Sequence, residues 1–163
     1  MYFIGIISDK DYNKIESELY KKLNEKEYNI ININNETIQN IKNVKFDIIL
    51  ITNVDFLTSE NNENLKKILN NSKYLIINTD IKNDLQILEE IEINVITYGF
   101  NSKTTITASS INEESILVCI QRNIKTIKGN LIEQQDKRVD IKGKINTSYM
   151  LGIIAILIIF EKI

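Results

Sequence analysis

The sequence predicts an α/β fold: a mostly parallel sheet flanked by helices, followed by an antiparallel β meander and a C-terminal helix. Three observations predict it. Over residues 1–100, short and almost purely apolar segments alternate with amphipathic ones. Over residues 101–145, polar and apolar side chains alternate, and residues 146–163 form an apolar run. Because strands buried on both faces are nearly all apolar, the first part predicts a parallel sheet covered on both sides by helices.

Five strands are expected in the parallel part. Each is a run of apolar residues that ends in a polar residue or glycine, as a buried strand does where it reaches a turn. In chain order they are Phe3–Ser8, Tyr28–Asn34, Phe46–Asn53, Lys73–Thr79 and Asn94–Gly99.

Amphipathic segments between these strands predict helices. The first runs over Asp11–Glu25, where apolar side chains recur at helical spacing. The second is expected to have Ser59 as its N-cap, with acidic residues in its first turn that complement the helix dipole. A third is marked by Leu85, Leu88 and Ile91.

Residues 101–145 predict an antiparallel meander of about three strands. The segment "KTTITASSI" alternates polar and apolar residues, as a strand with one solvated face does. The segments "SILVCIQRNI" and "NLIEQQDKRVDIK" follow without helical spacing, and Asn112–Glu114 and Lys128–Asn130 are short connections typical of hairpins. Since no Pro/Gly/Ser-rich linker interrupts the chain, residues 1–163 are expected to form a single domain.

The final segment, residues 146–163, is apolar from Tyr149 to Phe160. As a helix this stretch spans roughly 18 Å, against about 30 Å of bilayer hydrocarbon, which favours a helix buried against the sheet. Two alternatives stay open because the run is hydrophobic on all sides: a membrane tail, or a contact surface for another chain.

Composition excludes several classes of function. The 163 residues carry a net charge of −2 and a pI near 5.3, which gives no electrostatic reason to expect nucleic acid. Histidine is absent, so imidazole is excluded as a base, nucleophile or metal ligand. With a single cysteine and no basic region of a secretory signal in "MYFIGIISDKD", the expected location is cytoplasmic.

The corner between the first strand and the first helix is where many α/β proteins hold a phosphate. Such loops use glycines, so that several backbone N–H groups converge on the anion. Here the loop reads "SDKDYNK" and contains no glycine, and Asp9 and Asp11 lie where a phosphate would bind. Lys10 and Lys14 offset these charges only in part, so the loop predicts an ordinary helix start capped by acids.

Four stretches follow one another in an order and spacing that point to a family: "FIGIISDKDYNKIESELYKKL", "FDIILITNVDFLTSENNENLKKIL", "SKYLIINTD" and "INVITYGFNSKTTITASSI". They resemble the central, ATP-binding domain of the Mur ligase family, which includes the peptidoglycan amino-acid ligases and folylpolyglutamate synthetases. The tail "INTSYMLGIIAILI" is similar to the Ala/Ile-rich helix of that domain. The resemblance covers nearly the whole chain and implies a fold of the P-loop or Rossmann-like type.

The departures from the family pattern bear on activity. Where the family's phosphate loop has its lysine, this chain has Tyr12, and the neighbouring glycines become Ser8 and Asp11. The Asp-His pair that helps hold Mg²⁺ is replaced by "FLT" after "TNVD", and the family's acidic metal-binding segment and flanking domains have no counterpart in the sequence. Acyl-phosphate ligation needs that lysine, the metal ions and closure between domains. The resemblance therefore implies a degenerate relative that uses neither ATP nor Mg²⁺.

Candidate ligand-binding residues are accordingly vestigial, and no catalytic residue or metal ligand is expected. They lie at the ends of the predicted strands, in the loops after them and at the start of the first predicted helix, and are Ser8, Asp9, Lys10, Asp11, Tyr12, Asn13, Thr52, Asn53, Asn78 and Asp80. The acids Asp55, Asp80 and Asp84 have two interpretations, a receiver-like phosphoryl or metal site and ordinary solvated loop acids. Cys119 lies in the apolar segment "ILVCIQR" and is expected in the core.

The sequence thus predicts a Mur-ligase-like pseudoenzyme, a protein-binding or regulatory module linked by family association to cell-wall or sporulation processes. The expected partner is another protein or a second copy of the chain, bound through an apolar surface or the C-terminal helix. Two alternatives stay open. One is a domain that retains binding of a nucleotide or a UDP-linked precursor, and the other is a small protein tethered to a membrane by residues 146–163.

Overall fold

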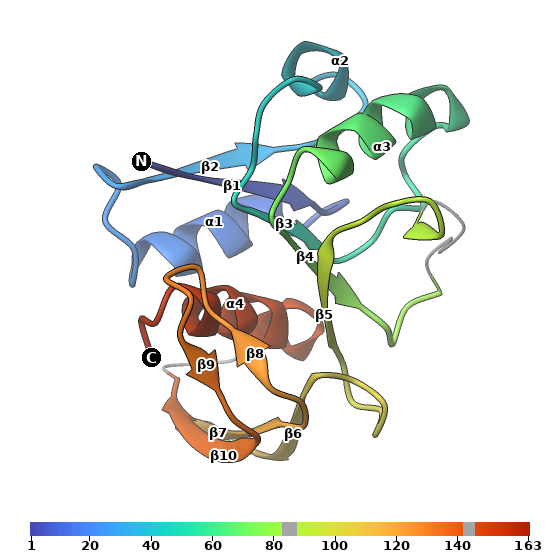
Figure 1. Cartoon of the computed structure of the whole chain (residues 1–163). Coiled ribbons are helices and arrows are strands. Elements are labelled where there is room, and N and C mark those ends of the chain that lie inside the picture. Colours follow the sequence, from blue (N-terminus) through green and yellow to red (C-terminus); the bar gives the residue numbers. More distant parts are fainter. Residues whose placement is uncertain (83–87, 142–145) are drawn as a thin grey trace.

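A computed structural model of the chain describes residues 1–82, 88–141 and 146–163 (Figure 1). Within them, one eight-stranded sheet has the strand order β10-β7-β6-β5-β4-β3-β1-β2. The strands β1 to β5 run parallel, which confirms the expected α/β class with a mostly parallel sheet. Their bounds are Tyr2–Ile7, Tyr28–Asn32, Ile48–Ile51, Tyr74–Asn78 and Asn94–Tyr98.

Apolar side chains explain why these segments form the centre of the sheet. Every residue of β3 and β4 is buried, and β1 is buried from Ile4 to Ile7. Each of the five strands ends one or two residues earlier than the sequence predicts. The polar residues and the glycine at these ends leave the ladder and enter turns, so Ser8, Thr52 and Thr79 lie just beyond their strands.

Helices cover both faces of the sheet, as expected (Figure 1). The helices α1 (Tyr12–Tyr20) and α4 (Thr147–Ile159) pack on one face in the larger apolar cluster. On the other face lie α2 (Ile38–Ile41), the 3-10 turn η1 (Ser59–Asn61) and α3 (Asn62–Asn70), whose buried residues are Leu65, Ile68 and Leu69.

Several predicted helix boundaries are wrong. The first helix ends at Tyr20 rather than Glu25, because the chain turns there and still buries Leu23 against the core. Ser59 does not cap the second helix: it begins η1, and Asn61 precedes α3 without a side-chain capping bond. The short helix α2 was not predicted. The helix predicted at Leu85–Ile91 falls partly on residues 83–87, outside the described residues.

The antiparallel part begins with β6 (Ile106–Ile111), which starts beside the end of β5 with Tyr98 paired to Ile106. The strands β7 (Ser115–Ile120) and β10 (Gln135–Asp140) continue the sheet in antiparallel pairing, which confirms a three-stranded meander. The two long segments predicted after β6 are each interrupted. Between β7 and β10 the chain forms a separate hairpin, β8 (Ile124–Lys125) with β9 (Leu131–Ile132).

Helix α4 is enclosed by the rest of the chain. Every residue from Leu151 to Phe160 is buried, and the helix packs against β3, β4, β5, β6 and α1. This burial explains why the segment is hydrophobic on all sides, as the buried-helix prediction requires. None of the helices in the described ranges combines the length and apolar character needed to cross a bilayer.

The end of α4 is tied to the β8–β9 hairpin. The N–H of Lys162 donates to Leu157 O at 2.8 Å and that of Glu161 to Ile158 O at 3.0 Å, the two bonds of a Schellman motif. Glu161 has a φ of 57°, a conformation usually taken by glycine. Its carboxylate compensates by accepting bonds from Thr126 Oγ1 at 2.6 Å and Asn130 Nδ2 at 2.8 Å.

Candidate functional site

The carboxyl ends of the parallel strands meet at one edge of the sheet, where open α/β proteins bind ligands. The loop after β1 and the residues after β3 border a shallow hollow of about 160 Å³ there. Its lining consists of Ser8, Asp9, Lys10, Asp11, Thr52, Asn53 and Ile81. The structure therefore brings the candidates from the first loop and from the end of β3 together.

The polar atoms of this hollow are held by the strand ends. Ser8 and Thr52 are buried, and the backbone N–H of Thr52 donates to Ile7 O at 3.0 Å, so the two strand ends are joined. Asp9 and Lys10 are exposed at the mouth. The hollow thus has a hydroxyl-lined floor and an acidic, solvated rim.

The prediction of an acid-capped helix start is wrong in its detail. Asp11 occupies the N-cap position of α1, but its side chain makes no capping hydrogen bond. Its φ of −102° and ψ of 3° differ from the extended conformation that an N-cap residue usually has. Its carboxylate instead lies 3.4 Å from the ammonium of Lys14, one turn along the helix.

Tyr12 and Asn13 do not line the hollow. The Tyr12 hydroxyl donates to Glu16 Oε1 at 2.7 Å and lies 3.3 Å from Ile30 O, so the ring packs between α1 and β2. Burial, with a further contribution from the Glu16 carboxylate, raises the pKa of Tyr12 well above its usual value. A neutral phenol thus occupies the position that the resemblance assigns to the phosphate-binding lysine. Asn13 is exposed on α1.

Asn78 and Asp80 organise the turns after β4 and β5 and do not line this hollow. The carboxylate of Asp80 accepts the N–H of Phe100 at 3.0 Å and 2.8 Å, and the Asp80 N–H donates to Asn78 Oδ1 at 2.9 Å. Gly99 has a φ of 152°, and a Cβ built there would lie 2.5 Å from Asp80 Oδ1. Asp80 therefore needs glycine beside it to reach the backbone of the turn after β5.

The remaining acids fit the interpretation of loop acids. Asp55 is exposed, and its N–H donates to Asn53 Oδ1 at 2.8 Å in a turn after β3. Within residues 1–82, 88–141 and 146–163, no three His, Cys, Asp or Glu side chains gather as a metal site would require. Asp84 lies outside the described residues.

Cys119 is not the core residue that the sequence predicts. It is a free cysteine, and it is half-buried because its side chain lies on the face of β7 opposite α4. On the neighbouring strands it is paired with Thr107 and Asp136. Its neighbours Val118 and Ile120 face the core and are buried. The apolar run around residue 119 concealed this alternation of faces.

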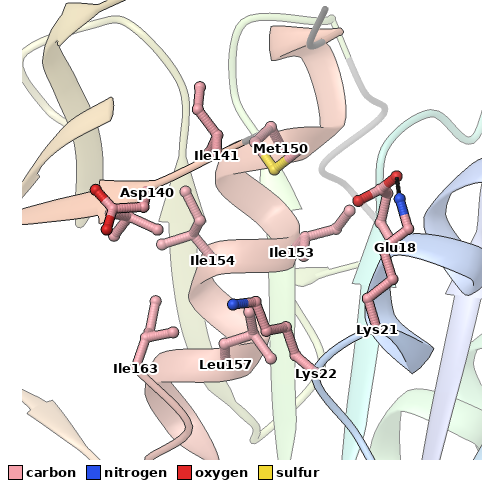
Figure 2. Close-up of a pocket in the computed structure, with 11 residues that line it drawn as sticks. Glu18, Lys21, Lys22, Asp140, Ile141, Met150, Ile153, Ile154, Leu157 and Ile163 are labelled. Atoms are coloured by element: carbon pink, nitrogen blue, oxygen red, sulfur yellow. Dashed lines mark hydrogen bonds and ion pairs between the residues drawn. The ribbon is translucent and has the colours of Figure 1, made fainter. Parts of the chain in front are cut away.

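A larger hollow, of about 600 Å³, lies elsewhere, between α1, α4 and the end of β10 (Figure 2). Its floor is the flank of α4, with Met150, Ile153, Ile154 and Leu157. Its charged rim is formed by Glu18 of α1 and by Lys21 and Lys22 in the turn after that helix, and Asp140 of β10 also borders it. The sequence did not predict this hollow, because the space exists only where α4 packs beside α1. The one signal for it in the sequence is that α4 is apolar on every side.

Comparison with known families and curated proteins found no matching family and no matching protein for this chain.

Proposed function

We propose that this chain is a non-catalytic module of the Mur-ligase central-domain type that acts by binding protein rather than by consuming ATP. The observation that carries the proposal is the loop after β1, at the strand edge where a nucleotide phosphate would be held. It has no glycine between Ser8 and Asp11, and it places Asp9 and Asp11 around the hollow. The resemblance described above associates the module with cell-wall or sporulation processes.

Electrostatics supports this proposal. A carboxylate about 4 Å from a phosphate oxygen opposes binding by about 1 kcal/mol per charge pair even in a watery setting. Two carboxylates border the hollow, and among the nearby lysines Lys14 is already paired with Asp11. With Lys10 in the lining and Lys14 paired with Asp11, the two carboxylates and two ammonium groups cancel, so an anion placed there meets no net attraction and lacks the converging N–H groups that a glycine-rich loop supplies.

The size of the hollow supports it as well. Pockets for small molecules and cofactors usually enclose about 300–1,000 Å³. The hollow beside Ser8 and Thr52 has about 160 Å³, which is too small to enclose a nucleoside triphosphate. Reaction chemistry adds a further reason, since the neutral phenol of Tyr12 cannot neutralise charge on a transferred phosphoryl group.

Isothermal titration calorimetry with ATP–Mg²⁺ and with UDP-linked precursors tests the proposal. We expect no binding in the micromolar range for either. A double variant, Asp9→Asn with Asp11→Asn, separates charge from loop shape, and we expect it also to bind no nucleotide because the amide cradle is still missing. A micromolar dissociation constant for the unaltered chain would contradict the proposal.

One observation favours a second candidate, a domain that retains binding of a small nucleotide or sugar. Ser8, Thr52 and Asn53 present hydroxyl and amide groups at the strand edge where ligands bind in open α/β sheets. A thermal-shift screen of nucleotides and UDP-linked sugars tests it. Stabilisation that a Thr52→Val variant loses would support this candidate, and no stabilisation by any compound would remove it.

A further inference from the structure

Strand β10 is the last strand of the sheet at one edge. It pairs with β7 on one side only. The N–H of Ile141 donates to Glu114 O at 2.8 Å, so Ile141 directs its backbone groups toward β7. The alternate residues before it, Val139, Lys137 and Gln135, do the same. Because antiparallel pairing alternates, Asp136, Arg138 and Asp140 direct their backbone N–H and C=O groups away from β7. Within the described residues, these groups have no backbone partner.

The 600 Å³ hollow lies directly beside this free edge. Val139, Asp140 and Ile141 form one of its walls and the apolar flank of α4 forms its floor (Figure 2). Val139 faces α4, whereas Arg138 and Asp140 face the opposite side of the sheet. A strand added to β10 would therefore direct alternate side chains into the hollow, as in other cases of strand addition.

We propose that this strand is β10 of a second copy of the same chain, which pairs antiparallel with the first across a two-fold axis. The inference rests on the proposed protein-binding function and names its partner. Such pairing satisfies the free N–H and C=O groups of both copies in one step, since a two-fold interface uses the same surface twice.

Charge selects the register. On the face away from α4, the strand carries Asp136, Arg138 and Asp140 in succession. With the axis at Arg138, like charges face each other at each of these positions, which is unfavourable. With the axis at Val139, Arg138 of each copy lies opposite Asp140 of the other, so opposite charges face each other. The backbone N–H and C=O groups that these two residues direct away from β7 also face each other and form the hydrogen bonds between the copies.

The apolar side of the strand favours the same register. With the axis at Val139, this side chain, which lines the hollow together with Ile154 and Leu157 of α4, meets its counterpart from the other copy. With the axis at Lys137, which also pairs Arg with Asp, two lysines face each other beside an apolar floor. Of the three registers, the Val139-centred one is therefore the one that pairs Arg138 with Asp140 on one face and brings the two Val139 side chains together on the other.

Arg138 and Asp140 are exposed and only weakly paired within one chain, so they are well placed to form ion pairs with the other copy. Their side chains are 67% and 92% exposed, and within one chain Arg138 Nε lies 4.0 Å from Asp140 Oδ1. That distance is at the limit of an ion pair, so the intramolecular contact contributes little. In the dimer each charge gains an opposite charge directly across the strands.

Sedimentation velocity and light scattering over the micromolar range test the inference, and we expect a dimer for the unaltered chain. Arg138→Asp alone and Asp140→Arg alone should each weaken dimerisation about tenfold or more, because each puts like charges opposite one another twice. An equimolar mixture of the two variants should dimerise again, because every facing pair in the heterodimer is then opposite in charge.

Arg122→Asp is the matched control, an exposed arginine beyond the end of β7 and outside the residues of β10 that pair in the proposed dimer, and it should leave dimerisation unchanged. Thermal unfolding of each variant checks that it is folded. A monomeric unaltered chain, or an R138D variant that dimerises as tightly as the unaltered chain, would overturn the inference. A mixture that stays monomeric would overturn the Val139 register. None of these results depends on nucleotide binding, so failure of the dimer and failure of the proposed function are distinguishable.

Discussion

Gly152 of α4 packs directly on the ring of Tyr98 of β5: a Cβ built on Gly152 would lie 3.0 Å from Tyr98 Cζ and 2.8 Å from Leu50 Cδ1. Tyr98 and Leu50 are fully buried, so neither has free space to move into. The missing side chain therefore sets how closely α4 lies on the sheet. This contact joins the C-terminal helix to two strands of the parallel part.

Enlarging Gly152 should destabilise the fold. Gly152→Val inserts atoms into a packed contact, and we expect a loss of about 1–3 kcal/mol in the free energy of unfolding. Urea denaturation measures it. Combining Gly152→Val with Leu50→Val, which removes the nearest methyl group, should cost less than the sum of the two single changes. An unchanged urea midpoint for Gly152→Val would show that the contact is looser than the structure indicates.

Asp47 should contribute more to the free energy of unfolding than its ion pair with Lys73 alone would. It is buried, and one carboxylate oxygen accepts the N–H of Phe3 at 2.9 Å while the other accepts the Lys73 ammonium at 2.6 Å. Asp47→Ala leaves the Phe3 N–H without its partner, and we expect a cost of about 1–3 kcal/mol in urea denaturation.

Lys73→Met is the matched change on the other side of this pair. The Lys73 side chain is 62% exposed, so losing it should cost at most about 1 kcal/mol. Equal losses for Asp47→Ala and Lys73→Met would mean that the ion pair, rather than the bond to the Phe3 backbone, accounts for the effect.

The stability of the α4 end should depend on pH through Glu161. Hydrogen bonds from Thr126 and Asn130, and the nearby Lys128 ammonium, hold the pKa of Glu161 below its usual value. A lowered folded-state pKa adds stability above the carboxyl's unfolded pKa, and this stability disappears as the pH falls through the folded value.

Glu161→Gln should therefore unfold at a lower temperature than the unaltered chain near neutral pH. The difference should shrink in acid and vanish below the folded pKa of Glu161, where the unaltered side chain is protonated too. Differential scanning calorimetry across this pH range measures it. A difference that is independent of pH would contradict the assigned role of the carboxylate charge.

The burial of α4 gives the most direct check on the C-terminal segment. Ile156 has no exposed surface, and Ile156→Ala should cost about 2–5 kcal/mol in urea denaturation. Ile111 on β6 is 40% exposed, and Ile111→Ala serves as the control with a smaller loss. Similar losses at the two positions would mean that α4 is not packed within its own chain.

The parallel strands were predictable because burial on both faces leaves few residue types available. Ile48–Ile51 and Tyr74–Asn78 are apolar in nearly every position, and that pattern alone identifies them. Because the strands are parallel, their carboxyl ends lie at the same edge of the sheet. This is why Ser8, which follows β1, and Thr52, which follows β3, could be expected beside one hollow. The contacts of Asp80 were not predictable, because its partner Phe100 lies 20 residues away in a turn with no regular pattern.

The sequence by itself determined which segments are the parallel strands, that helices cover both faces, and that the loop after β1 is acidic and without glycine. These are local properties of hydrophobic period and residue type. Only the tertiary structure decided that α4 is enclosed, that Glu161 adopts a left-handed conformation, and that a hollow opens between α1, α4 and the free edge of β10. Each of these features depends on which distant segments pack together, and the local pattern of residues along the chain does not specify that packing or the space left between the segments.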